Sequence, residues 1–201
     1  MQKPVDETRT FSDLARRIRA SAPHLGATRV VCVDGPSGSG KTTFATRLAA
    51  SLTCPTVHLD DLYPGWDGLA DSTSKLVEWV LEPLLEHRPA RYRRFNWDLG
   101  RYAEWHSVPE CGTLIVEGVG SGAARGYPVF LIWVEAPRDL RMKRGIERDG
   151  EAFRPHWERW ADQELRMFDE ARTRERADLL VDGNPGLPHD PEREFAVLRV
   201  G

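Results

Sequence analysis

Residues 35–43 combine glycines, a lysine and two threonines in the run GPSGSGKTT. The run matches G-x-x-x-x-G-K-[ST] at every fixed position. Glycines allow successive backbone N–H groups to point at phosphate oxygens, a lysine adds charge for the outer phosphates, and the threonine hydroxyl suits Mg²⁺. The alternative is a plain Gly/Ser turn between a strand and a helix. We therefore expect a nucleotide to contact Gly35, Ser37, Gly38, Ser39, Gly40, Lys41, Thr42 and Thr43.

Three carboxylates follow apolar runs that are typical of buried strands. Asp60 and Asp61 come directly after the run at 56–59, and Glu117 follows the run at 113–116. The carboxyl ends of parallel strands form the ligand-binding edge of such a sheet, so an aspartate there could accept a hydroxyl proton or hold Mg²⁺. The aspartates could instead end the strand and cap a turn. The metal ligands that we expect are Thr42, Glu117 and Asp60.

Arginines recur at helical spacing after Pro137, which suits the first turn of a helix. Placed on one helical face, they could close over a transferring phosphoryl group and neutralise its charge. Alternatively, this is a surface helix whose arginines pair with neighbouring acidic residues. The arginines in question are Arg138, Arg141, Arg144 and Arg148.

Basic and aromatic residues interleave at 91–106, a pattern that could stack on a base and hold a sugar or phosphate. A solvated face with buried aromatic rings is the alternative, and an RNA-binding patch has weak support in an acidic chain. Asn184 lies in the loop after the last apolar run and could border an adenine. The candidates for contact with an acceptor molecule are Asp61, Tyr63, Arg94, Asn96, Trp97 and Arg101.

The elements that must position these residues alternate between apolar runs and amphipathic segments, which indicates a three-layer α/β fold with a mostly parallel five-stranded sheet. We expect one domain over residues 1–201, with a short arginine-bearing lid at about 138–155. The expected strands are 30–33, 56–59, 113–118, 129–134 and 177–183, with a short edge strand at 195–200. The expected helices are 11–18, 44–52, 72–86 with a bend at Pro83, and 155–176.

The composition restricts the kinds of binding partner and the cellular compartment that we expect. The net charge of −3 and the pI near 6.1 provide no global basic field for nucleic acid or an anionic membrane. No run of apolar residues reaches the length of a membrane span. The three cysteines are widely spaced, which is typical of reduced thiols. We expect a cytoplasmic monomer or homodimer that binds a small molecule, with no nucleic-acid or membrane partner.

The segments GPSGSGKTT, HLDDLY, RYRRFNW, LIVEG and RDLRMKRGIERD together resemble the uridine kinase-like branch of the P-loop kinases, a branch that includes nicotinamide riboside kinases and phosphoribulokinase. The resemblance covers about residues 30–183. It implies ATP with Mg²⁺ as the phosphoryl donor, Asp60 as the catalytic aspartate and Glu117 as the metal-facing glutamate. It also implies a lid that carries Arg141, Arg144 and Arg148, with Lys41 and Arg144 acting in catalysis beside Asp60.

The chain departs from this branch at the acceptor segment. Phe95-Asn96-Trp97 stands nearest to the Tyr-Asp-Phe segment of uridine kinases, and an amide cannot offer a carboxylate to ribose hydroxyls. The basic stretch 88–101 would suit an acceptor that already bears a phosphate. Two hypotheses remain open. One is a kinase for a nucleoside-like or sugar-like alcohol, and the other is an ATP-hydrolysing regulatory module that acts on a protein partner.

Overall fold

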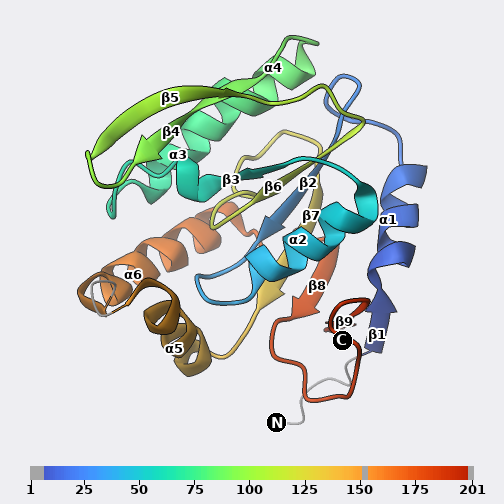
Figure 1. Cartoon of the computed structure of the whole chain (residues 1–201), viewed down its shortest axis with the longest axis vertical. Coiled ribbons are helices and arrows are strands. Elements are labelled where there is room, and N and C mark those ends of the chain that lie inside the picture. The colour runs from blue at the N-terminus through green and yellow to red at the C-terminus, as the bar shows by residue number, and fades with distance from the viewer. Residues whose placement is uncertain (1–6, 151–153, 199–201) are drawn as a thin grey trace.

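The computed structural model describes residues 7–150 and 154–198. Its centre is a seven-stranded sheet in the order β1-β9-β8-β7-β2-β6-β3 (Figure 1). The strands from β8 to β3 are parallel neighbours, whereas β9 and β1 extend the sheet in antiparallel pairings. The strands are β1 (Glu7–Thr10), β2 (Arg29–Asp34), β3 (Thr56–His58), β6 (Thr113–Glu117), β7 (Phe130–Glu135), β8 (Leu179–Asp182) and β9 (Glu194–Val197).

The five predicted parallel strands are confirmed, but the sheet has two strands more than the predicted five. One of them, β9, corresponds to the edge strand expected at 195–200, of which residues 199 and 200 lie outside the described residues. The other, β1, was missed because its sequence Glu-Thr-Arg-Thr is polar. A strand at the edge of a sheet pairs on one side only and needs no continuous apolar run.

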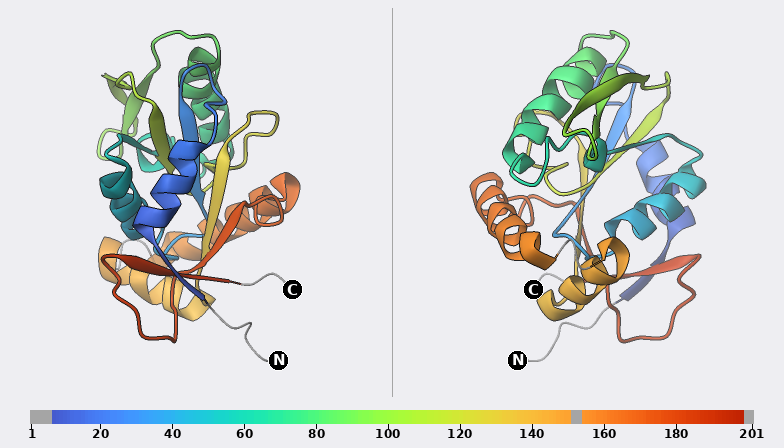
Figure 2. Two further views of the ribbon diagram at one scale, coloured as in Figure 1. Left: turned by 90° about the vertical axis from the view of Figure 1, so that its right-hand side faces the viewer. Right: turned by 60° about the vertical axis from the view of Figure 1, so that its left-hand side comes forward.

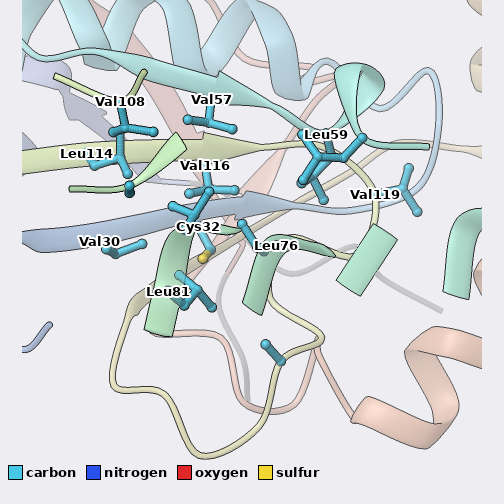
Figure 3. Packing of buried hydrophobic residues seen from close by; sticks show 14 of the residues in the cluster. Val30, Cys32, Val57, Leu59, Leu76, Leu81, Val108, Leu114, Val116 and Val119 are labelled. Atoms are coloured by element: carbon cyan, nitrogen blue, oxygen red, sulfur yellow. The ribbon is translucent and has the colours of Figure 1, made fainter. Parts of the chain in front are cut away.

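Strand β2 is buried on both faces of the sheet, as its apolar run predicted. Side chains alternate along it. Val31 and Val33 pack in the cluster that α1 and α2 cover, and Val30 and Cys32 face the opposite cluster (Figure 3). The sheet therefore has helices on both faces, which gives the predicted three layers.

The helices on the first face are α1 (Phe11–Ala20) and α2 (Lys41–Leu52). The second face is covered by α3 (Leu69–Leu76), the π-helical η2 (Val77–Leu81), α4 (Glu82–Leu85) and α6 (Arg154–Ala171) (Figure 2). Pro83 lies near the start of α4, directly after the π-helical segment, and the predicted bend at this residue stays a prediction. None of the described helices has both the length and the apolar character that a membrane span requires.

Two further elements surround the carboxyl edge of the parallel strands. The hairpin of β4 (Arg91–Asn96) and β5 (Arg101–Ser107) forms a separate two-stranded sheet, and the Tyr102 ring packs on Trp79 of η2 with centroids 5.2 Å apart. The predicted lid contains α5 (Arg138–Asp149) and the start of α6, whereas its residues 151–153 lie outside the described part of the chain.

Candidate active site

The glycine-rich loop connects β2 to α2, with Gly40 as the residue that caps the helix. Lys41 opens the helix and is 7% exposed, and its Nζ donates to the carbonyl of Pro36 at 3.0 Å. Gly38 has a φ of 76°, and a Cβ at this position would lie 2.3 Å from the carbonyl oxygen of Arg141 in α5. Glycine at position 38 therefore allows the loop and the lid helix to approach closely. The N-terminal end of α2 adds a positive dipole that favours bound phosphate.

A cavity of about 1120 Å³ opens beside this loop at the carboxyl edge of the sheet. It brings most of the predicted loop residues together with one aspartate and two lid arginines. The predicted residues that line it are Ser37, Gly38, Gly40, Lys41, Thr42, Thr43, Asp60, Tyr63, Trp97, Arg144 and Arg148. The predicted residues that do not line it are Gly35, Ser39, Asp61, Arg94, Asn96, Arg101, Glu117, Arg141 and Asn184.

Glu117 lies directly against the loop although it does not line the cavity. Its Oε1 accepts a hydrogen bond from Thr42 Oγ1 at 3.1 Å, and its Oε2 lies 2.9 Å from Nδ1 of His58. Burial alone would raise the pKa of Glu117, but the hydrogen bond with His58 and the charge of Lys41 outweigh burial and lower the pKa. The carboxylate is therefore ionised at neutral pH.

The Thr42–Glu117 pair fits Mg²⁺, which usually binds one or two carboxylates and leaves its other positions to water and substrate phosphates. The described residues contain no group of three or more His, Cys, Asp and Glu side chains that could enclose a metal ion. A site completed by nucleotide phosphates is consistent with this donor set.

Asp60 and Asp61 lie in the 3₁₀ turn η1 (Leu59–Asp61), not in an extended strand, and their contacts differ. Asp60 lines the cavity, whereas Oδ2 of Asp61 accepts a long hydrogen bond from the Tyr92 hydroxyl at 3.4 Å. The Asp60 side chain is exposed to the cavity, but the cavity walls displace much of its hydration. This desolvation and the like charge of Glu117 raise the pKa of Asp60, against the opposing charge of Arg148. Asp60 is thus a carboxyl group with increased proton affinity.

The lid helix α5 contacts the phosphate loop through two of its arginines. Nη1 of Arg141 donates to the carbonyl of Ser37 at 3.2 Å. Nη1 of Arg144 donates to the carbonyl of Gly183 at 3.1 Å and contacts that of Gly38 at 3.4 Å. The alternative of a surface helix paired only with its own acidic neighbours therefore does not describe these two residues.

Three of the predicted acceptor residues lie in the hairpin region and do not line the cavity. Arg94 binds Glu104 on the adjacent strand with Nε and Oε1 2.6 Å apart. Oδ1 of Asn96 accepts from the N–H of Leu99 at 2.9 Å and so closes the hairpin turn. Arg101 is exposed and does not line the cavity. Arg94 and Asn96 thus have partners within the hairpin, and their contact with an acceptor stays a prediction.

Aromatic rings form the cavity wall near Asp60. Trp97 is held there because its Nε1 donates to the main-chain carbonyl of Asp60 at 3.2 Å, and its ring centroid lies 5.1 Å from that of Trp66. Trp160 completes the wall, with its centroid 5.0 Å from that of Tyr63. Tyr63 is 2% exposed and its hydroxyl donates to a main-chain carbonyl, so this residue supports the wall with its ring.

Asp34 is a buried carboxylate beside the phosphate loop that the sequence analysis missed. It is fully buried at the end of β2 and accepts from the N–H groups of Gly35, Gly120 and Gly122 at 2.7, 2.8 and 2.8 Å. Burial raises the pKa of Asp34 to about 6, although these three hydrogen bonds act in the opposite direction. Asp34 thus ties the loop after β6 to the start of the phosphate loop. The available signal was a single acidic residue between an apolar run and the first loop glycine.

Glu164 was also missed as a site residue, because its spacing in the predicted helix 155–176 is that of a core position. It is 3% exposed, and its Oε1 accepts from the N–H of Ser37 at 2.8 Å. His58 was likewise assigned only to a strand, but it contacts the Glu117 carboxylate. Neither contact has a signal in the sequence.

The parallel sheet, the glycine-rich loop and the helix that it opens define a P-loop nucleotide-binding protein. The family model described as an AAA domain matches residues 30–170, and the chain belongs to this family.

Two curated relatives are cytidylate kinases. The protein from Pyrobaculum neutrophilum is 29% identical over 127 residues, which cover 62% of this chain and 62% of that protein. The protein from Halobacterium salinarum is 27% identical over 144 residues, which cover 70% of this chain and 71% of that protein. The match thus spans less than two thirds of the length of the first of these relatives.

Solved structures show the same fold. A protein described as a possible uridine kinase, from Bacillus stearothermophilus, has a TM-score of 0.61 at 18% identity, covering 85% of this chain and 96% of that chain. A protein provisionally named as a fructose transport system kinase, from Silicibacter sp. TM1040, has a TM-score of 0.52 at 19% identity, covering 84% of this chain and 95% of that chain. These likenesses establish the α/β architecture.

Proposed function

We propose that this protein is a small-molecule kinase that transfers the γ-phosphoryl group of ATP to a hydroxyl group of its acceptor. The observation that carries the proposal is a single cavity lined by both Lys41 of the phosphate loop and Asp60. Phosphoryl transfer needs the donor phosphates and the group that orients the attacking hydroxyl in one enclosed space. The resemblance to the uridine kinase-like branch supports the same reaction.

On the donor side, Lys41 and the loop N–H groups other than that of Ser37 would bind the phosphates of ATP, and Thr42 and Glu117 would hold Mg²⁺. When bound, Mg²⁺ neutralises charge on the phosphates. Arg144 and Arg148 line the same cavity from α5 and stabilise the charge that spreads over the transferring group. The cations on the donor side therefore come from the phosphate loop and from α5, and none comes from the hairpin.

On the acceptor side, a carboxylate oxygen of Asp60 takes the proton of the acceptor hydroxyl. The hydroxyl oxygen then forms the new bond to the γ-phosphorus as the bond to ADP breaks. The raised pKa of Asp60 suits this role, because a base is more effective when its pKa approaches the working pH. Asp61 accepts from Tyr92 and does not line the cavity, so we assign the proton transfer to Asp60 alone.

The aromatic side chains near Asp60 support an acceptor without a phosphate at this position, although the charge of Arg148 also acts on Asp60. The wall beside Asp60 consists of Trp66, Trp97 and Trp160, and a phosphate there would need cationic donors. Two of the hairpin arginines that could have supplied them have other partners: Arg94 binds Glu104, and Arg93 donates to main-chain carbonyls of β5 at 3.0 Å.

A second candidate is a kinase that phosphorylates a nucleoside monophosphate such as CMP. The two cytidylate kinases among the relatives favour it. This reaction would use the same donor site but would place an acceptor phosphate next to Asp60, where the described wall is aromatic.

A screen of acceptors tests the proposal. ADP release from MgATP is measured with nucleosides, sugars and other polyols, and with CMP and UMP, and products are identified by mass spectrometry. We expect a phosphate ester of one alcohol. Turnover with CMP alone would replace the first candidate with the second. Slow ADP release that no acceptor changes would contradict both and would favour the regulatory ATP-hydrolysing module.

Two neighbouring carboxylates provide a matched pair of variants. Asp60→Asn should reduce transfer roughly 10²–10⁴-fold, the usual scale for a lost general base, with ATP affinity retained. Asp61→Asn removes the same charge one residue away and should have a much smaller effect. Wild-type rates in the Asp60 variant would show that this carboxylate is not the base.

A further inference from the structure

Glu164 is a buried carboxylate that faces the phosphate loop, a part of the protein that must attract anions. Its residue is 3% exposed, and its Oε1 accepts from the N–H of Ser37 and from Nε1 of Trp160, both at 2.8 Å. Its Oε2 lies 3.8 Å from Nη1 of Arg141. Burying a carboxylate is costly unless hydrogen bonds and charge compensate for the lost water, and two hydrogen bonds and the nearby charge of Arg141 provide that compensation.

Every polar group of Ser37 is bound by α5 or α6. The N–H donates to Glu164, the carbonyl accepts from Arg141 at 3.2 Å, and the hydroxyl accepts from Trp160 at 2.9 Å. The Ser37 N–H is therefore already bonded to Glu164, and the contact of Ser37 with nucleotide stays a prediction, for which Ser37 lines the cavity. The N–H anchors the first half of the loop to α6, and the Ser37 carbonyl anchors it to α5.

Gly38, the next loop residue, packs directly against the lid helix α5. The backbone of Gly38 lies so close to Arg141 that a Cβ would be 2.3 Å from the Arg141 carbonyl oxygen. One turn further along α5, Arg144 contacts the carbonyls of Gly38 and Gly183. The position of Ser37 is thus coupled to the place where the lid helix rests on the loop.

We propose that Glu164 is a positioning residue that fixes the phosphate loop and the lid helix relative to each other before nucleotide binds. Without it, the N–H of Ser37 would lose its buried partner, Nε1 of Trp160 would keep only the Ser37 hydroxyl, and the loop would have to be ordered when ATP binds. Preorganisation of this kind increases affinity because the ordering cost is met during folding. The inference rests on the ATP-binding part of the proposed function and not on the identity of the acceptor.

Three variants of the full chain test it. Glu164→Ala removes the acceptor, Glu164→Gln retains an oxygen that can accept from Ser37, and Glu170→Ala removes an exposed carboxylate from the same helix. ATP affinity is measured by calorimetry, and exchange of the Ser37 amide hydrogen is measured by NMR in the nucleotide-free protein.

We expect Glu164→Ala to weaken ATP binding about tenfold, equivalent to about 1.4 kcal/mol, which is comparable to the cost of ordering one residue's backbone. The Ser37 amide should exchange at least tenfold faster in this variant. Glu164→Gln should restore both properties to within about threefold of wild type, and Glu170→Ala should leave both unchanged.

The inference is overturned if Glu164→Ala speeds Ser37 exchange without weakening ATP binding, or if neither property changes. It is also overturned if the glutamine variant loses as much affinity as the alanine variant, because the shared hydrogen bond would then be irrelevant. Wild-type protein that fails to bind ATP would instead refute the proposed function, so the two failures are distinguishable.

Discussion

Replacement of Gly38 by alanine should disturb the loop and the lid helix together. The left-handed backbone at φ 76° costs roughly 1–2 kcal/mol for a residue with a Cβ. The added Cβ would also lie 2.3 Å from the Arg141 carbonyl oxygen, a separation that must increase to at least 3.0 Å. The neighbouring atoms are backbone and cannot rotate away, so we add roughly 1–3 kcal/mol for overpacking. A total of about 3 kcal/mol corresponds to a fall in Tm of roughly 6–12 °C for a chain of this size.

The same displacement should weaken nucleotide binding. The contact of Arg144 with the Gly38 carbonyl is already 3.4 Å long, so a movement of several tenths of an ångström removes it. We expect ATP affinity to fall at least tenfold, measured by calorimetry at a temperature well below the Tm of the variant.

Gly126→Ala is the matched control, because Gly126 has a φ of 89° and no atom lies within 4 Å of the place that its Cβ would occupy. It should show the backbone cost alone, roughly 1–2 kcal/mol, with unchanged ATP affinity. If the Gly38 variant loses no more stability than this control and binds ATP normally, the close approach of loop and lid helix has no energetic importance.

Three further substitutions test other parts of the site. Lys41→Ala should keep the Tm within a few degrees but weaken ATP binding and abolish turnover, because the lost charge faces the outer phosphates; unchanged ATP affinity would contradict the loop assignment. Arg144→Ala should lower kcat more than it raises KM for ATP if the side chain stabilises mainly the transition state, whereas a lower Tm with normal kinetics would indicate a structural role. Asp34→Asn should lower the free energy of unfolding by about 2 kcal/mol, because an amide nitrogen then faces the Gly122 N–H, and thermal melts would measure this. Because the pKa of Asp34 is raised in the folded state, the folded protein keeps a proton between about pH 4 and about pH 6 that the unfolded protein releases. The contribution of Asp34 to the free energy of unfolding should therefore fall as pH rises through this range. The asparagine variant should lack this pH dependence.

Local patterns were sufficient for the central sheet and the phosphate loop. The run at 30–33 is apolar because β2 is covered on both faces, and the glycine pattern specifies a turn that few other sequences can adopt. Asp60 could be proposed from its place after a strand, because strand ends meet at one edge of a parallel sheet. The polar edge strand β1 was missed because one-sided pairing leaves no periodic apolar signal.

The partners of charged side chains were decided only by the tertiary structure. The sequence alone made Arg94 a candidate for binding an acceptor phosphate, but in the folded hairpin its guanidinium group binds Glu104. Glu164 contacts Ser37 across 127 positions of sequence, and His58 reaches Glu117 across 59. Periodicity assigns a residue to a face of an element, but the packing of distant elements selects which group on that face it meets. The sequence by itself therefore determined the chemistry that the phosphate loop can perform, whereas the folded chain determined which arginines and carboxylates are near enough to take part.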